Sequence, residues 1–558
     1  MSVTATKGVQ SLMQKTLERQ SATAQLKFRI KEKQVENIIL NFIEKHNNAP
    51  YNDLLKVLKE YPLNDQNFKN LIDDCLSCVM MLDRQVAPFL EIVYNIEWVS
   101  RTEELVQLYS KFILNLVTAH TYHCERVMTS LAMLFKTNGD HWDDCPPGEI
   151  LHKWSNVHKL IAQIVAVMPM TSKLLIRTIE NLFPYFKAGS YINRSYVHNL
   201  IWISKYIPSL REQIMTVIIC RMIEMDVNVV ERAKNKPQSD TMFEMEVEET
   251  DEVTDTLDYC MIEMLRWLEN EREPIMKDLV TAFMRYILPT YGIGHVQFLL
   301  LYTVSINQQC ADSVLNNLWV VAAGLHESGP GAIATRRTAA SHLAGLLARC
   351  VRVPNTRLIK YLKCMTEWCH SYITATQEST AATDSTKVHG AFYAICHSIF
   401  YLIAFKHQHL FSSKESVTFV ESLNLPRIVS CALNPLRSCP PQVIHAFSSV
   451  TRSHQVAYCQ PIIEKNSRHS LLVTTIQYDD WFPYDPYSLT RSGNILWPLC
   501  IEYKNWAKSG VDETQYSSIK KKLIAEDDDF LVASSPMKLS TSLSNCISPG
   551  FKTSETVM

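Results

Sequence analysis

The sequence predicts an all-α protein, built as a HEAT- or armadillo-like superhelical solenoid of antiparallel helix pairs. Three observations favour this fold class: glycine is scarce, apolar residues recur with a helical period, and one helix–turn–helix pattern returns after about 40 residues. Of 558 residues, 14 are glycine and 47% are hydrophobic. Nucleotide-binding folds and β-sandwiches need glycine in their turns, so this composition is typical of a helical chain.

The helical period runs through most of the chain. Between about residues 34 and 506, apolar residues recur at i, i+3, i+4 and i+7, as in Leu105, Leu108, Phe112 and Leu116. These stretches extend over about 12–20 residues and end at proline or polar clusters, as helices do.

The repeat appears when the chain is compared with itself. Residues 157–161, VHKLI, return at 197–201 as VHNLI, and each copy runs on to an apolar residue followed by Pro169 or Pro208. One helix pair cannot cover its own apolar face, so neighbouring pairs are expected to stack on it. The second helices are expected over 172–183 and 210–225, with a repeat turn at Met225-Asp226-Val227 and further turns at Pro289 and Pro354.

Charge divides the chain into regions. Nine carboxylates and no Lys or Arg lie between Asp240 and Asp258, and like charges at this density repel each other. We therefore expect an acidic, disordered and flexible loop over 240–258 between two HEAT-repeat halves, 1–239 and 259–515. Whether roughly the first 30 residues are disordered stays open. The charged and Ser/Thr-rich tail, 516–558, is expected to be flexible.

The charge balance, the cysteines and the apolar runs each restrict what kind of protein this is. The net charge of −2 hides a basic body, because 55 basic residues face only 48 acidic ones outside the acidic loop. The sixteen cysteines lie mostly in apolar stretches, where reduced cysteine is a small hydrophobe. The N-terminus lacks the apolar core of a signal peptide, and the densest apolar run, 298–306, is about half of a membrane span. We expect a cytosolic or nuclear protein without membrane contact.

Motifs of catalysis are missing from the sequence. It contains no GxxxxGK[ST], HExxH or GxSxG motif and no dinucleotide fingerprint. Cys75 and Cys78 have the spacing of a zinc pair, but no second pair lies nearby, so core cysteines are favoured. His141, Asp143, Asp144 and Cys145 read better as a polar turn than as a metal site. We expect no enzyme activity, cofactor or metal.

Three features suggest contacts with partners. A basic group after the apolar run 343–347 could engage phosphates or an acidic partner, or be an ordinary solvated face. The aromatic segment 481–487 could be a docking epitope, although folding back to cap the last repeat is favoured. Serines before proline in the tail and two hydroxyls at a repeat turn are candidate phosphorylation sites. The residues are Arg349, Arg352, Arg357 and Lys360; Ser535 and Ser548; and Thr171 and Ser172.

Eight stretches between about residues 150 and 530 are similar, in the same order, to segments of one family. They are 196–200 continued by 208–211 and 225–228; 295–298; 347–349; 389–393 with 405–407; 433–436; 462–466; 482–486 with 491–492; and 526–530. The chain resembles the RNA polymerase I-specific transcription initiation factor family, called TIF-IA in animals. The first about 110 residues resemble it only loosely.

The resemblance implies a non-catalytic HEAT-repeat protein of the nucleus and nucleolus that acts in rRNA synthesis. Such factors bind RNA polymerase I near its stalk and bridge it to the promoter selectivity factor at ribosomal RNA genes. Protein kinases regulate them, here at a polymerase-binding surface of Thr171, Ser172, Lys173 and Arg194. The vertebrate proline after this position is replaced, so a proline-directed kinase is not expected there.

The resemblance also concerns the basic group. The stretch 343–352 matches a family segment tied to promoter or selectivity-factor contact, which favours that role, or a weak DNA contact, at Arg349 and Arg352 and at the neighbouring Arg357 and Lys360. Whether the free protein forms a homodimer stays open. The alternative function is a HEAT scaffold of another class, in nuclear transport or trafficking. A helical enzyme would need a pocket with converging titratable groups, which the sequence does not indicate.

Overall fold

The computed structural model describes residues 30–31, 33–45, 48–235, 252–325, 332–377, 386–470, 483–484 and 487–503. Among these residues no strand forms beyond one isolated antiparallel bridge, between Cys350 and Cys500. The predicted all-α class is therefore confirmed. The chain forms two compact units, Met1–Val217 and Ile218–Met558. The predicted tail with Ser535 and Ser548, and residues 240–251 of the predicted acidic loop, lie outside the described residues.

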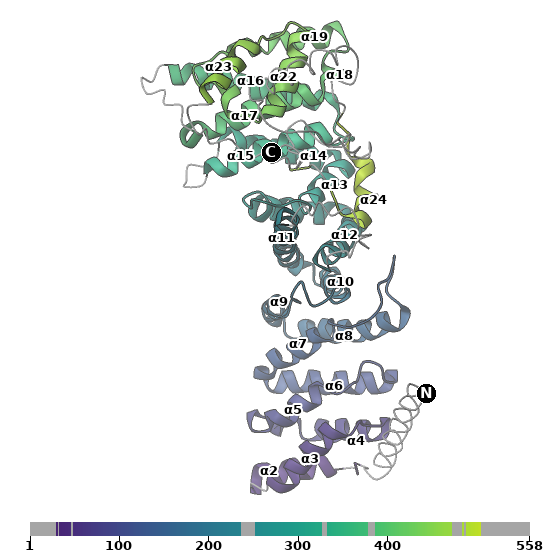
Figure 1. Ribbon diagram of the computed structural model, residues 1–558. Helices are drawn as coiled ribbons and strands as arrows, with labels where there is room; N and C mark the ends of the chain where they lie inside the picture. Colours follow the sequence, from purple (N-terminus) through teal and green to yellow (C-terminus); the bar gives the residue numbers. More distant parts are fainter. Residues whose placement is uncertain are drawn as a thin grey trace, which may run out of the picture. The chain divides into compact units, whose positions relative to one another are not determined.

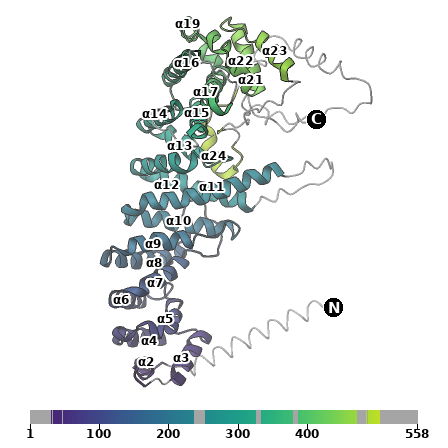
Figure 2. The ribbon, with the colours of Figure 1, turned by 90° about the vertical axis from the view of Figure 1, so that its left-hand side faces the viewer.

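Unit 1 is a succession of short helices. In both views each helix lies next to those before and after it in the sequence (Figure 1, Figure 2). The helices are α2 (Gln34–Lys45), α3 (Asn48–Glu60), α4 (Asp65–Ser77), η1 (Val79–Met81), η2 (Arg84–Val86), α5 (Ala87–Tyr94), α6 (Glu103–Ala119), η3 (Thr121–His123), α7 (Cys124–Met133), α8 (Gly148–Val167), α9 (Thr171–Asn181), α10 (Ser190–Tyr206) and η4 (Pro208–Leu210). The following helix, α11 (Arg211–Asn235), contains the boundary between the units.

Hydrogen bonds in unit 1 join residues that are about 40 positions apart in the chain, which is close to the length of the predicted repeat. His120 Nε2 lies 3.0 Å from Val79 O, 41 residues earlier. His158 Nε2 lies 3.0 Å from Asn199 Oδ1, again 41 residues away. The prolines mark the turns as expected, because Pro169 separates α8 from α9 and Pro208 begins η4 after α10.

Aromatic side chains fill the space between the helices of unit 1. Trp154 of α8 is 1% exposed, and Phe135 and Tyr196 are fully buried. The His158 ring stacks on Phe135 at 5.1 Å and on Trp202 at 4.4 Å. Burying a large aromatic or aliphatic side chain contributes about 1.5–3 kcal/mol, so these layers supply much of the stability of the unit.

Unit 2 contains the remaining helices. They are α12 (Glu252–Ala282), η5 (Phe283–Ile287), α13 (Phe298–Ile306), α14 (Gln308–Ala323), α15 (Ala332–Arg349), α16 (Asn355–Gln377), α17 (Thr386–Phe405), α18 (His407–Leu410), α19 (Lys414–Ser422), α20 (Leu425–Val429), α21 (Pro435–Ser438), α22 (Pro441–Ser453), α23 (Gln460–Ser470), α24 (Thr490–Leu496) and η6 (Trp497–Leu499). Local signals set their ends: the side chain of Asn307 accepts two backbone N–H groups at the start of α14, and Gly324 ends it in the left-handed region.

Helix α17 lies in the core of unit 2. Its stretch Val388–Phe405 is long and apolar enough to cross a membrane by length and composition, but 89% of it is buried inside the protein. An apolar helix with this burial is a core helix, because its hydrophobic surface is already covered by neighbouring helices.

Two sequence predictions in this region were wrong in detail. Residues 252–258 do not belong to an acidic loop but form the first turns of α12. Asp255 and Asp258 find partners there, since Asp255 pairs with Arg491 at 2.7 Å and Asp258 accepts the backbone N–H of Arg491 at 2.9 Å. Met225-Asp226-Val227 lies inside α11 rather than at a turn.

The segment 487–503, here the returning segment, runs back along the earlier helices of unit 2. Its helix α24, yellow in Figure 1, lies against α12 although the two are far apart in the sequence. Just before it, Tyr484 is buried and its hydroxyl lies 3.2 Å from His342 Nδ1 of α15. The described residues of the aromatic segment therefore fold back, and Tyr484 packs on α13 and α15, where a cap on the last repeat was expected. Its residues 481–482 and 485–486 lie outside the described residues.

Candidate functional site

The turn between α8 and α9 carries the predicted phosphorylation site. Thr171 begins α9, and its hydroxyl donates to Met168 O at 2.7 Å. The Ser172 hydroxyl donates to Pro169 O at 2.7 Å. Thr171 is only 6% exposed, whereas Ser172 is half-buried and Lys173 is exposed. A kinase would therefore reach Ser172 more readily than Thr171.

Arg194, predicted on the same surface, is buried. It is 1% exposed, and its guanidinium donates to Trp142 O and, at 3.2 Å, to Asp143 O. The guanidinium also stacks over the Trp142 ring at 4.2 Å. Arg194 thus holds the loop before α8 against α10, and the prediction of a surface role was wrong because this face of α10 packs inward. The polar group 141–145 belongs to this loop, and no set of metal ligands exists among the described residues.

The predicted basic group splits into residues with different surroundings. Arg352 and Lys360 are exposed. Arg357 is half-buried and pairs with Asp312, with Nε 2.6 Å from one carboxylate oxygen and a terminal nitrogen 2.7 Å from the other. Because this pair compensates its charge, Arg357 adds little to an attractive surface for phosphate or acidic groups.

Arg349 is buried under the returning segment. It is 4% exposed, its guanidinium donates to Ile501 O at 2.8 Å, and it lies over the Phe405 ring at 5.0 Å. A direct contact of this side chain with a partner, as predicted from the sequence, is wrong for this conformation. Of the four basic residues, Arg352 and Lys360 are the ones open to a partner.

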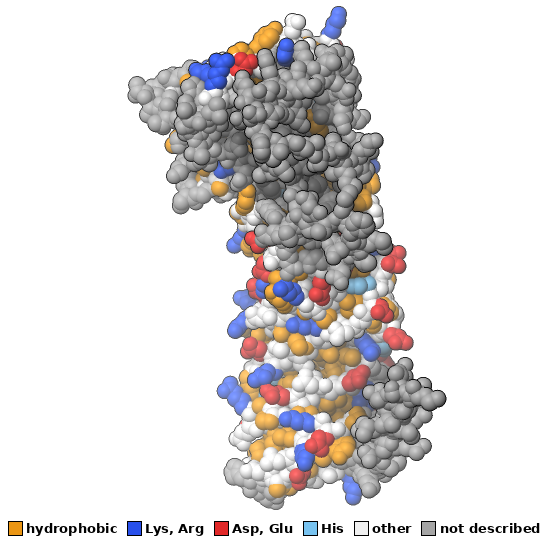
Figure 3. All heavy atoms as spheres, viewed as in Figure 1, with side chains coloured by type: hydrophobic (Ala, Val, Ile, Leu, Met, Phe, Trp, Pro, Cys, Tyr) orange, Lys and Arg blue, Asp and Glu red, His pale blue; other side chains and the backbone are white. Residues whose placement is uncertain are grey.

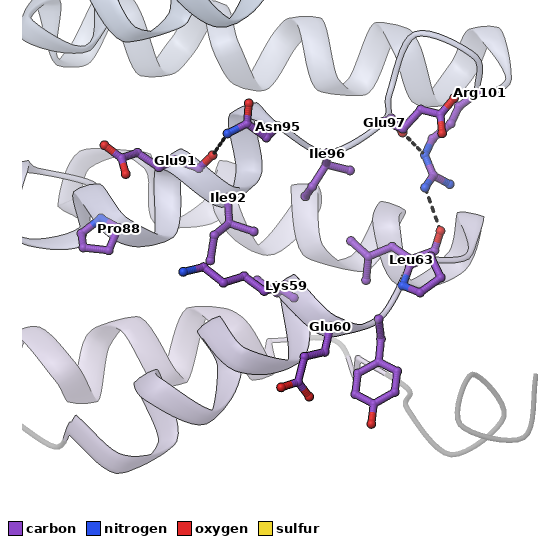
Figure 4. Close-up of a pocket in the computed structure, with 13 residues that line it drawn as sticks. Lys59, Glu60, Leu63, Pro88, Glu91, Ile92, Asn95, Ile96, Glu97 and Arg101 are labelled. Atoms are coloured by element: carbon purple, nitrogen blue, oxygen red, sulfur yellow. Dashed lines mark hydrogen bonds between the residues drawn. The ribbon is translucent and has the colours of Figure 1, made fainter. Parts of the chain in front are cut away.

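A hollow in the surface of unit 1, which sequence reasoning missed, lies between α3, α5 and the chain before α6 (Figure 4). Its volume is about 730 Å³. Arg101 closes one end, where its guanidinium donates to Glu97 O at 2.8 Å and Leu63 O at 2.7 Å. Apolar side chains alternate with charged ones around it: Leu63, Pro88, Ile92 and Ile96 with Lys59, Glu60, Glu91 and Glu97.

This hollow suits contact with another macromolecule better than catalysis. Its charged residues Lys59, Glu60, Glu91 and Glu97 are exposed, whereas catalytic groups are usually desolvated so that their pKa values shift. The described face of unit 1 in Figure 3 likewise shows basic, acidic and hydrophobic side chains interspersed. A protein–protein interface as a whole is about as apolar as the rest of the surface, so this mixed composition is compatible with a contact but does not mark one.

Comparison with known proteins identifies related chains. The family model described as "RNA polymerase I specific transcription initiation factor RRN3" matches residues 28–261 and 230–508. The RNA polymerase I-specific transcription initiation factor RRN3 of Mus musculus is 29% identical over 554 residues, covering 87% of this chain and 83% of the mouse protein. The rrn3 factor of Schizosaccharomyces pombe is 25% identical over 503 residues, covering 80% of this chain and 81% of the yeast protein.

A solved structure has the same fold. The crystal structure of RNA polymerase I transcription initiation factor Rrn3 is similar with a TM-score of 0.69 and 18% sequence identity. The alignment covers 86% of this chain and 100% of that one. At this identity the likeness concerns the fold, and it supports the helical repeat architecture of both units.

Proposed function

Because the chain belongs to the family of RNA polymerase I-specific transcription initiation factors, we propose that it is a non-catalytic adaptor in initiation at ribosomal RNA genes. It binds RNA polymerase I near its stalk and bridges the enzyme to the promoter selectivity factor. A nuclear place of action follows from the family, and we propose the nucleolus. The observation that carries the proposal is the family match over both units, 28–261 and 230–508.

The turn between α8 and α9 is proposed to face the polymerase. Ser172 and Lys173 stand next to Met170, whose side chain is 89% exposed. An exposed methionine beside a lysine and a hydroxyl offers both apolar and polar contacts. A phosphate on Ser172 adds about −1.5 to −2 charge at this point and would weaken contact with an acidic partner surface, which is the proposed mode of regulation by kinases.

Arg352 and Lys360 are proposed to contact the promoter selectivity factor or, weakly, DNA. Both side chains are exposed; Arg352 lies in the turn between α15 and α16, and Lys360 lies in α16. Exposed basic groups mainly raise the association rate and the specificity of a contact, and they add less to its affinity. Ser535 and Ser548 are proposed as further phosphorylation sites, and a homodimer of the free protein is a further proposal.

The function is tested by depletion and add-back. A nuclear extract depleted of this protein should lose transcription from a ribosomal RNA promoter and regain it when the purified chain is added. A promoter read by RNA polymerase II serves as the matched control and should stay active in the depleted extract. The proposal would be contradicted if depletion left transcription from the ribosomal RNA promoter unchanged. It would also be contradicted if the tagged chain purified with transport cargo in place of polymerase I subunits.

A further inference from the structure

The returning segment is joined to the end of α15 by one short antiparallel pairing of backbones. The N–H groups of Val351 and Ile501 donate to carbonyls of the opposite segment at 3.0 and 2.7 Å. Cys350 and Cys500 face each other between these two hydrogen bonds. They are thus a pair of the non-hydrogen-bonded type, in which opposite side chains lie closest.

This type of pairing has the spacing of a disulfide. Opposite Cα atoms in such a pair lie about 4.5 Å apart, and disulfides join Cα atoms about 4.4–6.8 Å apart. Neither cysteine takes part in a disulfide in this structure. Cys350 Sγ lies 3.2 Å from Ser305 Oγ, so the sulfur must rotate about the Cα–Cβ bond to reach Cys500. That rotation gives up one hydrogen bond of a thiol, which is a weak donor and a weak acceptor.

The two thiols differ in their access to solvent. A thiolate is the nucleophile in cysteine oxidation, so access of the oxidant decides which sulfur reacts first. Cys500 is partly exposed and Cys350 is buried, so an oxidant from solvent meets Cys500 first.

We propose that Cys350 and Cys500 form a reversible disulfide that locks the returning segment onto α15. Hydrogen peroxide, as the simplest hydroperoxide, is the oxidant. The Cys500 thiol loses its proton, its sulfur attacks one peroxide oxygen, the O–O bond breaks, and the leaving hydroxide takes up that proton, so a sulfenic acid and one water form. The Cys350 thiol loses its proton in turn, its sulfur attacks the Cys500 sulfur, and the displaced hydroxide takes up that proton and leaves as a second water. Two thiols and one peroxide thus give one disulfide and two waters, and a dithiol reductant reverses the change.

The disulfide would affect the exposure of Arg349, the buried member of the basic group 349–360. With the disulfide closed, the backbone of 499–501 stays paired with α15 and Arg349 stays covered. With the disulfide open, the segment is held by non-covalent contacts alone, among them the ion pair of Arg491 with Asp255. The proposal rests on the pairing of the two cysteines, so it stands or falls independently of the adaptor function.

The test uses the full-length chain and hydrogen peroxide. After oxidation, free thiols are blocked with N-ethylmaleimide, and the digest is searched by mass spectrometry for a peptide that links Cys350 to Cys500. The linked peptide should form, disappear on treatment with dithiothreitol and be absent from Cys500→Ser. Cys369 and Cys396 are the matched internal control: their Sγ atoms lie 3.9 Å apart, but both are fully buried and burial raises the pKa of the Cys396 thiol. This control pair should stay reduced.

Hydrogen exchange gives a second readout. Oxidation should slow exchange of the Val351 and Ile501 amides by about tenfold or more in the wild-type chain and leave it unchanged in Cys500→Ser. Alkylation of both cysteines without any linked peptide would overturn the proposal. Oxidation of Cys500 to a sulfinic acid, or its linkage to a second chain while Cys350 stays alkylated, would overturn it as well.

Discussion

Asp226 and His295 form a buried pair in unit 2, in which Asp226 Oδ1 lies 2.8 Å from His295 Nδ1. The other carboxylate oxygen accepts the backbone N–H groups of Gly294, His295 and Val296 at 3.2, 2.7 and 2.8 Å. A carboxylate only accepts, so His295 Nδ1 carries the proton of this hydrogen bond. On the other side of the ring, Nε2 lies 2.7 Å from Ser488 Oγ. One side chain of α11 thus orders the loop before α13, and that loop in turn holds the returning segment.

Replacing Asp226 should therefore destabilise unit 2. In Asp226→Asn the amide group places an N–H toward groups that are themselves donors, so we expect a loss of about 3 kcal/mol in the free energy of unfolding. The urea dependence of hydrogen exchange in peptides that cover 290–300 measures it. Ser488→Ala is the matched control, because it removes one exposed hydroxyl from the same network and should cost about 1 kcal/mol or less. Equal effects of the two variants would contradict this role of Asp226.

A second prediction concerns the close approach of Tyr484 to α15. A Cβ atom at Gly345 would lie 2.6 Å from Cδ2 of Tyr484. Alanine is favoured over glycine inside a helix by about 1 kcal/mol, but here the ring must move and lose its hydrogen bond with His342. We expect Gly345→Ala to lower stability by about 1–3 kcal/mol, as overpacking does, and to speed proteolysis of 483–503.

The control for this variant is Gly148→Ala. Gly148 starts α8, and an added Cβ meets nothing within 4 Å there. Limited proteolysis with mass spectrometry follows both variants. If Gly345→Ala leaves the returning segment as resistant to proteolysis as in the wild-type chain, the position of Tyr484 does not depend on glycine at residue 345.

The sequence was sufficient to predict the fold class, because the signals that predict it lie between residues close together in the chain. Helical periodicity, scarce glycine and the prolines at 169 and 208 are properties of neighbouring residues, and the helix pairs follow from them. The burial of Arg349 depends on Ile501, and the burial of Arg194 depends on the loop at Trp142. Such contacts join segments that are distant in the chain, so no local sequence pattern predicts them.

The same reasoning explains what was missed in the acidic stretch. The density of carboxylates predicts repulsion, but Asp255 and Asp258 gain a partner, Arg491, from the far end of the chain. The hollow bounded by Arg101 was also not foreseen, because it depends on the packing of α3 against α5. The family-like stretch at 491–492 indicates that Arg491 matters, but nothing in the sequence indicates that its partners are Asp255 and Asp258.

The basic group yields a third prediction, based on the difference between Arg349 and Arg352. Arg349→Ala removes a hydrogen bond to the partly buried Ile501 carbonyl and a cation–π contact, so it should cost about 2 kcal/mol of stability. Arg352→Ala removes an exposed side chain and should change stability by less than about 0.5 kcal/mol. Thermal unfolding measures both. If Arg352 contacts the selectivity factor, Arg352→Ala should weaken binding in a pull-down without changing the melting temperature; unchanged binding would count against that contact.

A fourth prediction separates the two hydroxyls at the turn before α9. Ser172→Asp places a negative charge in the first turn of α9, where the helix dipole favours it by about 0.3–1 kcal/mol, so stability should be kept. Binding of RNA polymerase I should fall because the charge imitates a phosphate.

Thr171→Asp instead buries a charge and should lower the stability of the protein before any effect on binding. A pull-down with polymerase I and a melting curve distinguish the variants, with Ser172→Ala as the uncharged control. Full binding by a well-folded Ser172→Asp would exclude this turn from the interface.

The last prediction is the pH dependence that His158 gives to unit 1. Burial lowers the pKa of this side chain from its ordinary 6.5 to about 3, against the opposing effect of its hydrogen bond with Asn199. Between these values the unfolded state binds a proton that the folded state does not, so stability falls as pH falls below 6.5. The slope is about 1.4 kcal/mol per pH unit, or about 2 kcal/mol between pH 6.5 and pH 5.

Hydrogen exchange in peptides of α8 and α10 measures this slope without contributions from unit 2. His158→Gln cannot take up the proton and should flatten the slope, whereas His152→Gln, at an exposed position of the same helix, should leave it unchanged. The same slope in all three proteins would mean that protonation of His158 does not oppose folding.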